Sequence, residues 1–137
     1  MTGAWRAEQN NVDQWIQADF RVIRRLISIA TLADRNTGHR VTLYTISYSL
    51  TNHYWLQLDT LFDGNSDDVW MQTNFLPGSV VARYIRLHPL TWHGSISLLW
   101  DVTWCRVDGK WYHIALIYAL ISELWYCYIT YAKKKQK

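Results

Sequence analysis

Hydrophobic and polar residues alternate in short runs along residues 14–105, and residues typical of turns separate the runs. The clearest run extends from Val41 to Leu50, where β-branched and aromatic residues predominate and successive side chains fall on opposite faces. Six further runs of this character span residues 15–20, 26–31, 55–58, 69–73, 81–87 and 95–104. Predicted turns lie at 33–38, 63–65, 76–78 and 92–94. Seven short strands joined in this way predict an all-β sandwich or barrel.

The last part of the chain has a different pattern, which divides the sequence into a β-domain at 1–105 and a tail at 106–137. From Trp111 to Ala132, 18 of 22 residues are apolar, and a Lys cluster at 133–137 ends the chain. This length is enough to cross the ~30 Å hydrocarbon core of a bilayer. The Lys cluster is typical of a cytoplasmic flank, whereas Glu123 opposes insertion because a central charge costs roughly 2–3 kcal/mol.

Two interpretations of this tail stay open. A helix from about Trp111 to about Tyr131 would form a single-pass membrane anchor, since a helix satisfies its own backbone groups within lipid. Alternatively, the segment is a hydrophobic extension that packs on the β-domain or aggregates. Partitioning of the chain between the membrane and soluble fractions of a cell separates these two interpretations.

Composition and charge narrow the classes of function. The 137 residues are 50% apolar and 15% aromatic, which indicates one folded domain and excludes a disordered chain. The formal net charge of +3 is unevenly distributed. Residues 1–105 hold eight Arg, no Lys and nine Asp or Glu, a net charge of −1, so the tail carries the excess of +4. A β-domain without excess positive charge has no surface that follows a phosphate backbone, and we expect no nucleic-acid partner.

The sequence contains no pattern that indicates catalysis, a cofactor or a metal. The five His residues lack the close spacing of zinc ligands, and the two Cys residues allow one disulfide at most. Asp63, Asp67 and Asp68 loosely resemble a calcium loop, but a tight turn explains the intervening Gly-Asn pair better. No nucleophile-elbow, phosphate-binding or dinucleotide-binding motif is present. We therefore expect a binding protein and not an enzyme.

Three stretches of the β-domain carry the motifs of one known family. The first holds GAWRA at 3–7, NN at 10–11 and QWIQADF at 14–20. The second holds IAT at 29–31 and VTLYTISYS at 41–49, followed by Trp55. The third holds FDGNSD at 62–67, NF at 74–75, ARYIRLHPLTWHG at 82–94 and SISL at 95–98. On these residues the chain resembles, from Gly3 to Cys105, the discoidin or coagulation factor 5/8 type C domain family.

The resemblance implies a discoidin-type jelly-roll β-sandwich, a galactose-binding-domain-like architecture, in a copy that lacks the family's first strand. Leu99 stands where the family has an Arg, so we expect the Asp67 carboxylate to lack its partner. Cys105 matches the family's closing Cys, whose usual partner belongs to the part that this chain lacks.

The resemblance also implies a function, that of a non-catalytic recognition or adhesion module outside the cell or on its surface. In the family, loops at one end of the sandwich contact ligands, and the corresponding segments here are 7–13 and 32–40. The candidate ligand-binding residues in these loops are Asn10, Asn11, Asp34, Arg35, Asn36, His39 and Arg40. Because these side chains are polar, they suit the hydroxyl groups of a glycan or the surface of a cell-surface or matrix protein.

A phospholipid surface is the competing ligand, and a membrane-anchored remnant without a ligand is the third interpretation. Membrane insertion requires exposed apolar side chains with a basic rim, and in the candidate loops only Val12 and Leu32 are of this kind. Aromatic side chains dominate sandwich cores, so we expect the tryptophans of the β-domain in the core. These are Trp5, Trp15, Trp55, Trp92, Trp100 and Trp104.

Overall fold

The computed structural model describes residues 3–107, apart from the side chain of residue 79. Its strands are β1 (Trp5–Arg6), β2 (Ile16–Leu32), β3 (Arg40–Ser49), β4 (Leu56–Gln57), β5 (Phe62–Asp63), β6 (Gln72–His93) and β7 (Ser97–Arg106). The expected all-β class is confirmed for this range. Residues 3–107 contain no helix, and so none with the length and apolarity to cross a bilayer. The apolar tail from Trp111 to Ala132 lies outside the described residues.

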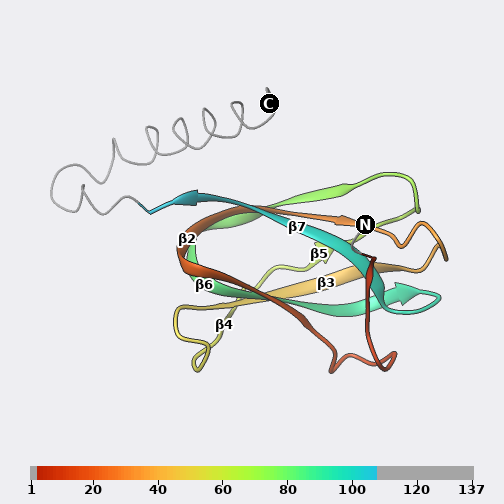
Figure 1. The fold of residues 1–137 in the computed structure, drawn as a ribbon, viewed down its shortest axis with the longest axis horizontal. Coiled ribbons are helices and arrows are strands. Elements are labelled where there is room, and N and C mark those ends of the chain that lie inside the picture. The colour runs from red at the N-terminus through yellow and green to blue at the C-terminus, as the bar shows by residue number, and fades with distance from the viewer. Residues whose placement is uncertain (1–2, 108–137) are drawn as a thin grey trace, which may run out of the picture.

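The two longest strands bend and contribute to both layers of the fold. β2 has 17 residues and β6 has 22, and they pair antiparallel with register shifts after Asp19 and after Leu26. Arg21, in the bend of β2, takes the left-handed conformation with φ 67°. In Figure 1, β2 starts at the right, turns at the left and returns to the right, with β6 beside it.

The expected strand boundaries are wrong at both bends. The runs at 15–20 and 26–31 meet in β2, and the run at 81–87 lies in β6 together with the last two residues of the run at 69–73. The expected turn at 76–78 is a bulge inside β6, where Gly78 takes φ 64° and the strand continues. Gly and Pro mark turns and bulges alike, so the sequence pattern does not separate the two.

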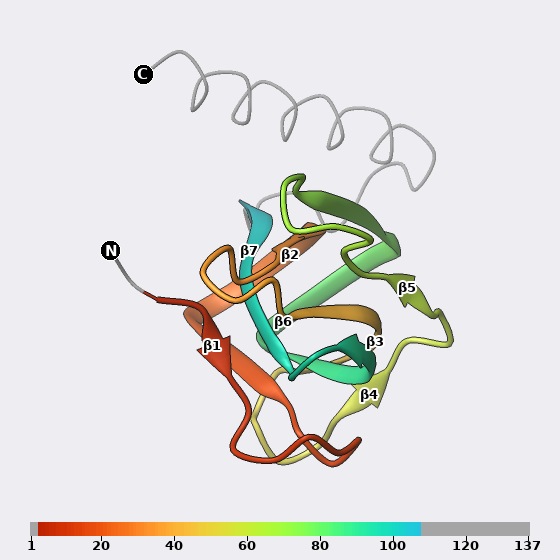
Figure 2. The same cartoon turned by 90° about the vertical axis from the view of Figure 1, so that its right-hand side faces the viewer.

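The strands form a two-layered sandwich (Figure 2). One layer holds β7, the second half of β2 and the first half of β6. The other holds the first half of β2, the second half of β6, and β3 with the short strands β4 and β5 paired to it. β1 pairs with the start of β7 through Trp5↔Leu98 and Arg6↔Ser97. Cys105, near the end of β7, is buried and is not a free thiol.

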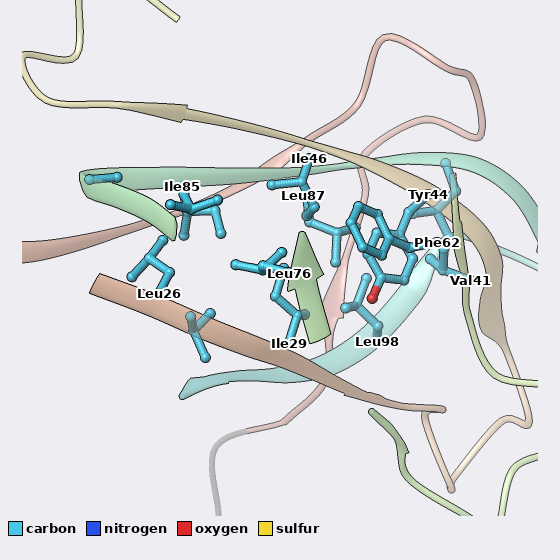
Figure 3. Packing of buried hydrophobic residues seen from close by; sticks show 14 residues of the cluster. Leu26, Ile29, Val41, Tyr44, Ile46, Phe62, Leu76, Ile85, Leu87 and Leu98 are labelled. Carbon is cyan, nitrogen blue, oxygen red and sulfur yellow. The ribbon is translucent and has the colours of Figure 1, made fainter. Parts of the chain in front are cut away.

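The hydrophobic core fills the space between the two layers (Figure 3). It consists of Leu26, Ile29, Val41, Tyr44, Ile46, Phe62, Leu76, Val80, Ala82, Ile85, Leu87, Ile96, Leu98 and Val102. The rings of Tyr44 and Phe62 stack with their centroids 5.5 Å apart. Burial raises the pKa of Tyr44 to about 12, and its hydroxyl accepts a hydrogen bond from Asn74 Nδ2 at 3.0 Å. Each large apolar side chain buried here contributes about 1.5–3 kcal/mol.

The tryptophans divide between the core and the surface. Three of them pack against the core, as expected: Trp5, Trp92 and Trp100. Trp15 and Trp104 are exposed, against expectation. The guanidinium of Arg86 lies 3.9 Å from the ring centroid of Trp15, and that of Arg24 lies 3.8 Å from the ring centroid of Trp104. A cation–π contact stabilises an aromatic ring at the surface, which the hydrophobic pattern alone does not reveal.

Candidate functional site

Three connections meet at one end of the sandwich, which faces the viewer in Figure 2. They are residues 7–15 between β1 and β2, 33–39 between β2 and β3, and 94–96 between β6 and β7. Because β2 bends, both of its ends reach this side of the molecule (Figure 1). The N–H of Ala7 donates to the carbonyl of Ile96 at 3.1 Å, which joins the first connection to the third. The structure therefore places the two loops expected from the sequence at the same end.

The two asparagines of the first loop, Asn10 and Asn11, hold the loop in shape. Asn10 Oδ1 accepts a hydrogen bond from the N–H of Ile96 at 2.8 Å. Asn11 Oδ1 accepts from the N–H of Asp13 at 3.1 Å and from Gln14 Nε2 at 2.9 Å. A side-chain oxygen that already accepts a hydrogen bond within the protein is less available to a ligand. Asn10 and Asn11 therefore stabilise the shape of the loop.

Asp34 begins the second loop and is buried, although the sequence suggested a ligand contact for it. Its Oδ2 accepts hydrogen bonds from Arg6, with Nε at 3.1 Å, and its Oδ1 accepts from the N–H of Asn36 at 3.1 Å. The Arg6 guanidinium holds the pKa of this carboxyl below its usual value. The backbone carbonyl of Asp34 also accepts from the N–H groups of Thr37 and Gly38. Asp34 therefore organises the loop from inside.

The remaining candidates of the second loop reach the surface to different degrees. Arg35 and Asn36 are exposed, whereas His39 and Arg40 are half-buried. Arg40 Nη1 donates to the carbonyl of Gly38 at 3.0 Å. The His39 ring lies over Gly94, where a Cβ atom would stand 2.3 Å from His39 Cδ2. Arg35 and Asn36 are thus the candidate side chains best placed to meet a ligand.

A third loop, residues 64–71, adjoins this end and does not appear among the candidates from the sequence. Arg35 Nη2 donates to the carbonyl of Val69 at 3.1 Å, which places this loop against the second one. Val69, Trp70 and Met71 follow one another and are 53%, 74% and 63% exposed. The pattern at 69–73 predicts a strand, but β6 begins only at Gln72, which leaves the indole of Trp70 outside the sheet.

The backbone of this third loop is fixed by side chains. Asp67 Oδ1 accepts from the N–H groups of Val69 at 2.9 Å and Trp70 at 2.8 Å. Asn65 Nδ2 donates to the carbonyl of Trp70 at 2.9 Å. The expectation that Asp67 lacks a partner is therefore wrong, because backbone N–H groups replace the arginine. The two hydrogen bonds that Asp67 accepts, above all the one from the N–H of Trp70, hold the pKa of its carboxyl below the usual value.

The arrangement suits non-covalent recognition. A flat, exposed indole lies on a fixed backbone, and the guanidinium of Arg35 and the amide of Asn36 stand on the adjoining loop. Such a combination offers apolar contact beside hydrogen-bond donors and acceptors. Among residues 3–107, no group of three or more His, Cys, Asp or Glu side chains could hold a metal ion.

The bent strands and the loops gathered at one end define a jelly-roll β-sandwich. The chain belongs to the F5/8 type C domain family, whose pattern matches residues 1–102, so the resemblance read from the sequence is confirmed. Domains of this family are extracellular ligand-binding modules.

Individual relatives are consistent with this membership. The chain is 36% identical to dog coagulation factor VIII over 111 residues, which covers 76% of this chain and 5% of that protein. It is 29% identical to rat lactadherin over 109 residues, which covers 74% of this chain and 26% of that protein. Discoidin II from Dictyostelium discoideum superposes with a TM-score of 0.72 at 25% identity, over 77% of this chain and 42% of that one. The chain thus spans a small part of these curated relatives.

Proposed function

We propose that this chain is a non-catalytic extracellular recognition module, which binds a glycan or a glycan-bearing protein surface at the loop end of the sandwich. The observation that carries the proposal is the position of Trp70, 74% exposed, beside the loop that presents Arg35 and Asn36. An aromatic face packs against the C–H side of a sugar ring, while guanidinium and amide groups bond to its hydroxyls.

The fixed loop geometry supports the same conclusion. Arg35 bonds to the carbonyl of Val69, so the second and third loops are joined before any ligand arrives. Asp67 and Asn65 hold the backbone of Trp70 from both sides. Binding to loops that are already ordered loses less conformational entropy, and a modest number of contacts is then sufficient.

A glycan array probed with the full chain tests this proposal. We expect binding to a limited set of glycans, and we expect Trp70→Ala and Asn36→Ala each to abolish or strongly reduce it. Tyr54→Ala is the matched control, because Tyr54 is also an exposed aromatic residue but lies between β3 and β4, at the opposite end. Loss of binding in the Tyr54 variant, or its retention in the Trp70 variant, would contradict the proposed site.

A phospholipid surface is the second candidate ligand, and one observation favours it. Val69 and Met71 flank Trp70 and are exposed as well, so the third loop has the apolar tip that the first two loops lack. The backbone N–H and carbonyl groups of Val69 and Trp70 all have partners, which lowers the cost of moving them out of water. Liposome sedimentation with and without phosphatidylserine separates the candidates, since pelleting that requires this lipid, with an empty glycan array, would favour the membrane.

The apolar tail of the chain bears on where in or outside the cell the protein is located. We place the β-domain outside the cell, and we propose the segment from Trp111 to Ala132 as a membrane anchor with the Lys cluster at 133–137 on the cytoplasmic side. Alkaline carbonate extraction of expressing cells tests this, with a chain ending at Cys105 as the comparison. If both chains are soluble, the tail is an extension of the sandwich and not an anchor.

A further inference from the structure

The layer that contains β3 carries an arginine on the face that points away from the core. This layer, which Figure 1 shows below β7, also holds the first half of β2 and the second half of β6. Ile85 and Leu87 of β6 are fully buried in the core, and side chains alternate along a strand, so Arg86 between them points to the outer face. The proposed function gives this face no ligand.

Arg86 is held in position from three sides. Its guanidinium carbon lies 3.9 Å from the ring centroid of Trp15 and 3.8 Å from that of Trp55. Trp15 directly precedes β2 and Trp55 directly precedes β4, so the two rings come from strands on either side of β6. The Nε–H donates to Oε1 of Gln17, which stands opposite Arg86 in the register, at 2.9 Å. A guanidinium fixed in this way loses little conformational entropy when it binds a ligand.

The outer edge of this guanidinium still has hydrogen bonds to donate. A guanidinium has five N–H groups, and here only the Nε–H is used, by Gln17. Within residues 3–107, the two Nη atoms of Arg86 have no hydrogen-bond partner, and both reach the surface of the protein. Their four N–H groups are therefore open to a ligand from outside.

No carboxylate neutralises this cation in the described part of the chain. Asp19 lies two positions beyond Gln17 on β2, but both of its oxygens accept from Arg83, at 2.9 and 3.0 Å. Partial burial lowers the pKa of Arg86, and no nearby carboxylate raises it again. Burial and the charge of Arg86 also lower the pKa of His88, two positions along β6. A partly desolvated cation attracts an incoming carboxylate more strongly than a fully solvated arginine does.

The side chains around Arg86 are of the types that contribute most to binding at protein interfaces, where Trp, Tyr and Arg are enriched. Trp15 is 44% exposed, and Trp55 and Tyr84 are half-buried. Their rings offer apolar surface on both sides of the cation. This combination fits a peptide segment in which apolar side chains flank an acidic one.

We infer that this face docks a segment of a partner protein, whose Asp or Glu carboxylate accepts two hydrogen bonds from the Nη atoms of Arg86. Paired bonds between a guanidinium and a carboxylate are strong and directional, so the fixed orientation of Arg86 also gives specificity. The apolar neighbours of the carboxylate contact the rings of Trp15 and Trp55. A free small carboxylate lacks these contacts and binds more weakly. The inference does not depend on the ligand of the loop end.

Nuclear magnetic resonance of the ¹⁵N-labelled full chain tests the inference with three probes at millimolar concentration: acetyl-Val-Glu-Val-amide, acetyl-Val-Gln-Val-amide and acetate. We expect the acidic peptide to shift the Nε–H of Arg86 and the indole N–H groups of Trp15 and Trp55 in a saturable way. The neutral peptide and acetate should each bind roughly tenfold more weakly or less, because one lacks the charge and the other lacks the apolar contacts. Equal affinity for the neutral peptide, or for acetate, would overturn the inference.

Gln17→Glu is the variant that tests the charge without removing the arginine. It keeps an oxygen acceptor for the Nε–H of Arg86 and places a carboxylate beside the guanidinium, so the fold should be retained while peptide binding weakens roughly tenfold or more. Gln9→Glu is the matched control, because Gln9 Oε1 also accepts a hydrogen bond, from Asn11 Nδ2 at 3.0 Å, but lies in the loop at 7–15. Equal peptide affinity in the two variants would contradict the part given to Arg86.

The same variants separate this inference from the proposed function. Gln17→Glu should keep binding on the glycan array, whereas Trp70→Ala should lose it and keep the affinity for the acidic peptide. Loss of both kinds of binding in either variant would show that the two sites are not independent. Absence of a saturable shift with the acidic peptide would overturn the docking face and leave the proposed function unaffected.

Discussion

The Arg6 guanidinium donates two hydrogen bonds to the same carboxylate oxygen of Asp34, with Nε at 3.1 Å. Arg6 belongs to β1 and Asp34 opens the loop at 33–39, so this pair joins two segments separated by 28 positions in the sequence. The same carboxylate accepts from the N–H of Asn36. The shape of the loop that presents Arg35 and Asn36 therefore depends on one buried carboxylate.

Replacement of this carboxylate should affect both stability and binding. We expect Asp34→Asn to lower the urea midpoint and to weaken ligand binding, because the amide offers one oxygen where the carboxylate offers two. Asp59→Asn removes an exposed carboxylate and is the control for the change in charge. Equal urea midpoints in the two variants would contradict the role given to Asp34.

Gly94 and Gly78 provide a matched pair that tests the packing of His39. Both have positive φ, 71° and 64°, so alanine at either site is strained by about 1–2 kcal/mol. A Cβ at Gly78 meets nothing within 4 Å, whereas one at Gly94 stands 2.3 Å from the His39 ring. We expect Gly94→Ala to destabilise the chain by roughly 1–3 kcal/mol more than Gly78→Ala in urea denaturation, and to shift the His39 resonances. Equal destabilisation would show that the His39 ring moves aside without cost.

Arg86 lies between two tryptophan rings, 3.9 Å from the centroid of Trp15 and 3.8 Å from that of Trp55. Its Nε also donates to Gln17 Oε1 at 2.9 Å. Because a lysine ammonium does not stack as a planar guanidinium does, we expect Arg86→Lys to destabilise the fold by about 1 kcal/mol or more.

The control for this substitution is Arg21→Lys, since the Arg21 side chain is 85% exposed. We expect it to change the free energy of unfolding by about 0.5 kcal/mol at most. Urea denaturation followed by tryptophan fluorescence measures both variants. If both substitutions change the free energy of unfolding by a similar amount, the stacked guanidinium of Arg86 does not stabilise the fold.

The carboxylate of Asp19 should contribute to the stability of the chain in a way that depends on pH in the acid range. Arg83 donates to both carboxylate oxygens, at 2.9 and 3.0 Å, and these bonds lower the pKa of Asp19 to about 2. Since an unfolded Asp has a pKa of about 3.9, the contribution is complete above that value and is lost as the pH falls toward about 2. The stability difference between the wild type and Asp19→Asn should shrink over this interval. A constant difference would contradict the ion pair, and Arg83→Gln should return the pKa of Asp19 toward its ordinary value.

Much of the fold follows from local pattern, because a strand with one buried face has a period of two. The run from Val41 to Leu50 corresponds to β3 within one residue at each end. The bends of β2 and β6 do not follow in the same way. A bulge interrupts the period without ending the pairing, and Gly78 marks a bulge as readily as a turn.

The candidate site is only partly predictable for a different reason. The family motifs predict which end of the sandwich and which two loops form the site. The surroundings of each side chain in these loops depend on residues that are distant in the sequence. Asp34 is buried because of Arg6, and no local signal gives that contact. Trp70 has a local signal, since an Asp that accepts from N–H groups two and three positions later is typical of an Asx turn.

The bend of β2 has a consequence for how copies of this domain can differ in length. One insertion within the paired stretches of β2 would shift the register by one position and turn its core-facing side chains outward. It would also displace the loop attached to that stretch, which is 7–15 for the first stretch and 33–39 for the second. An insertion between Asp19 and Arg24, where the pairing with β6 is already interrupted, would only enlarge the bend. Variation in length should therefore accumulate at the bend, opposite the end that carries the loops, while the two paired stretches of β2 keep a constant length.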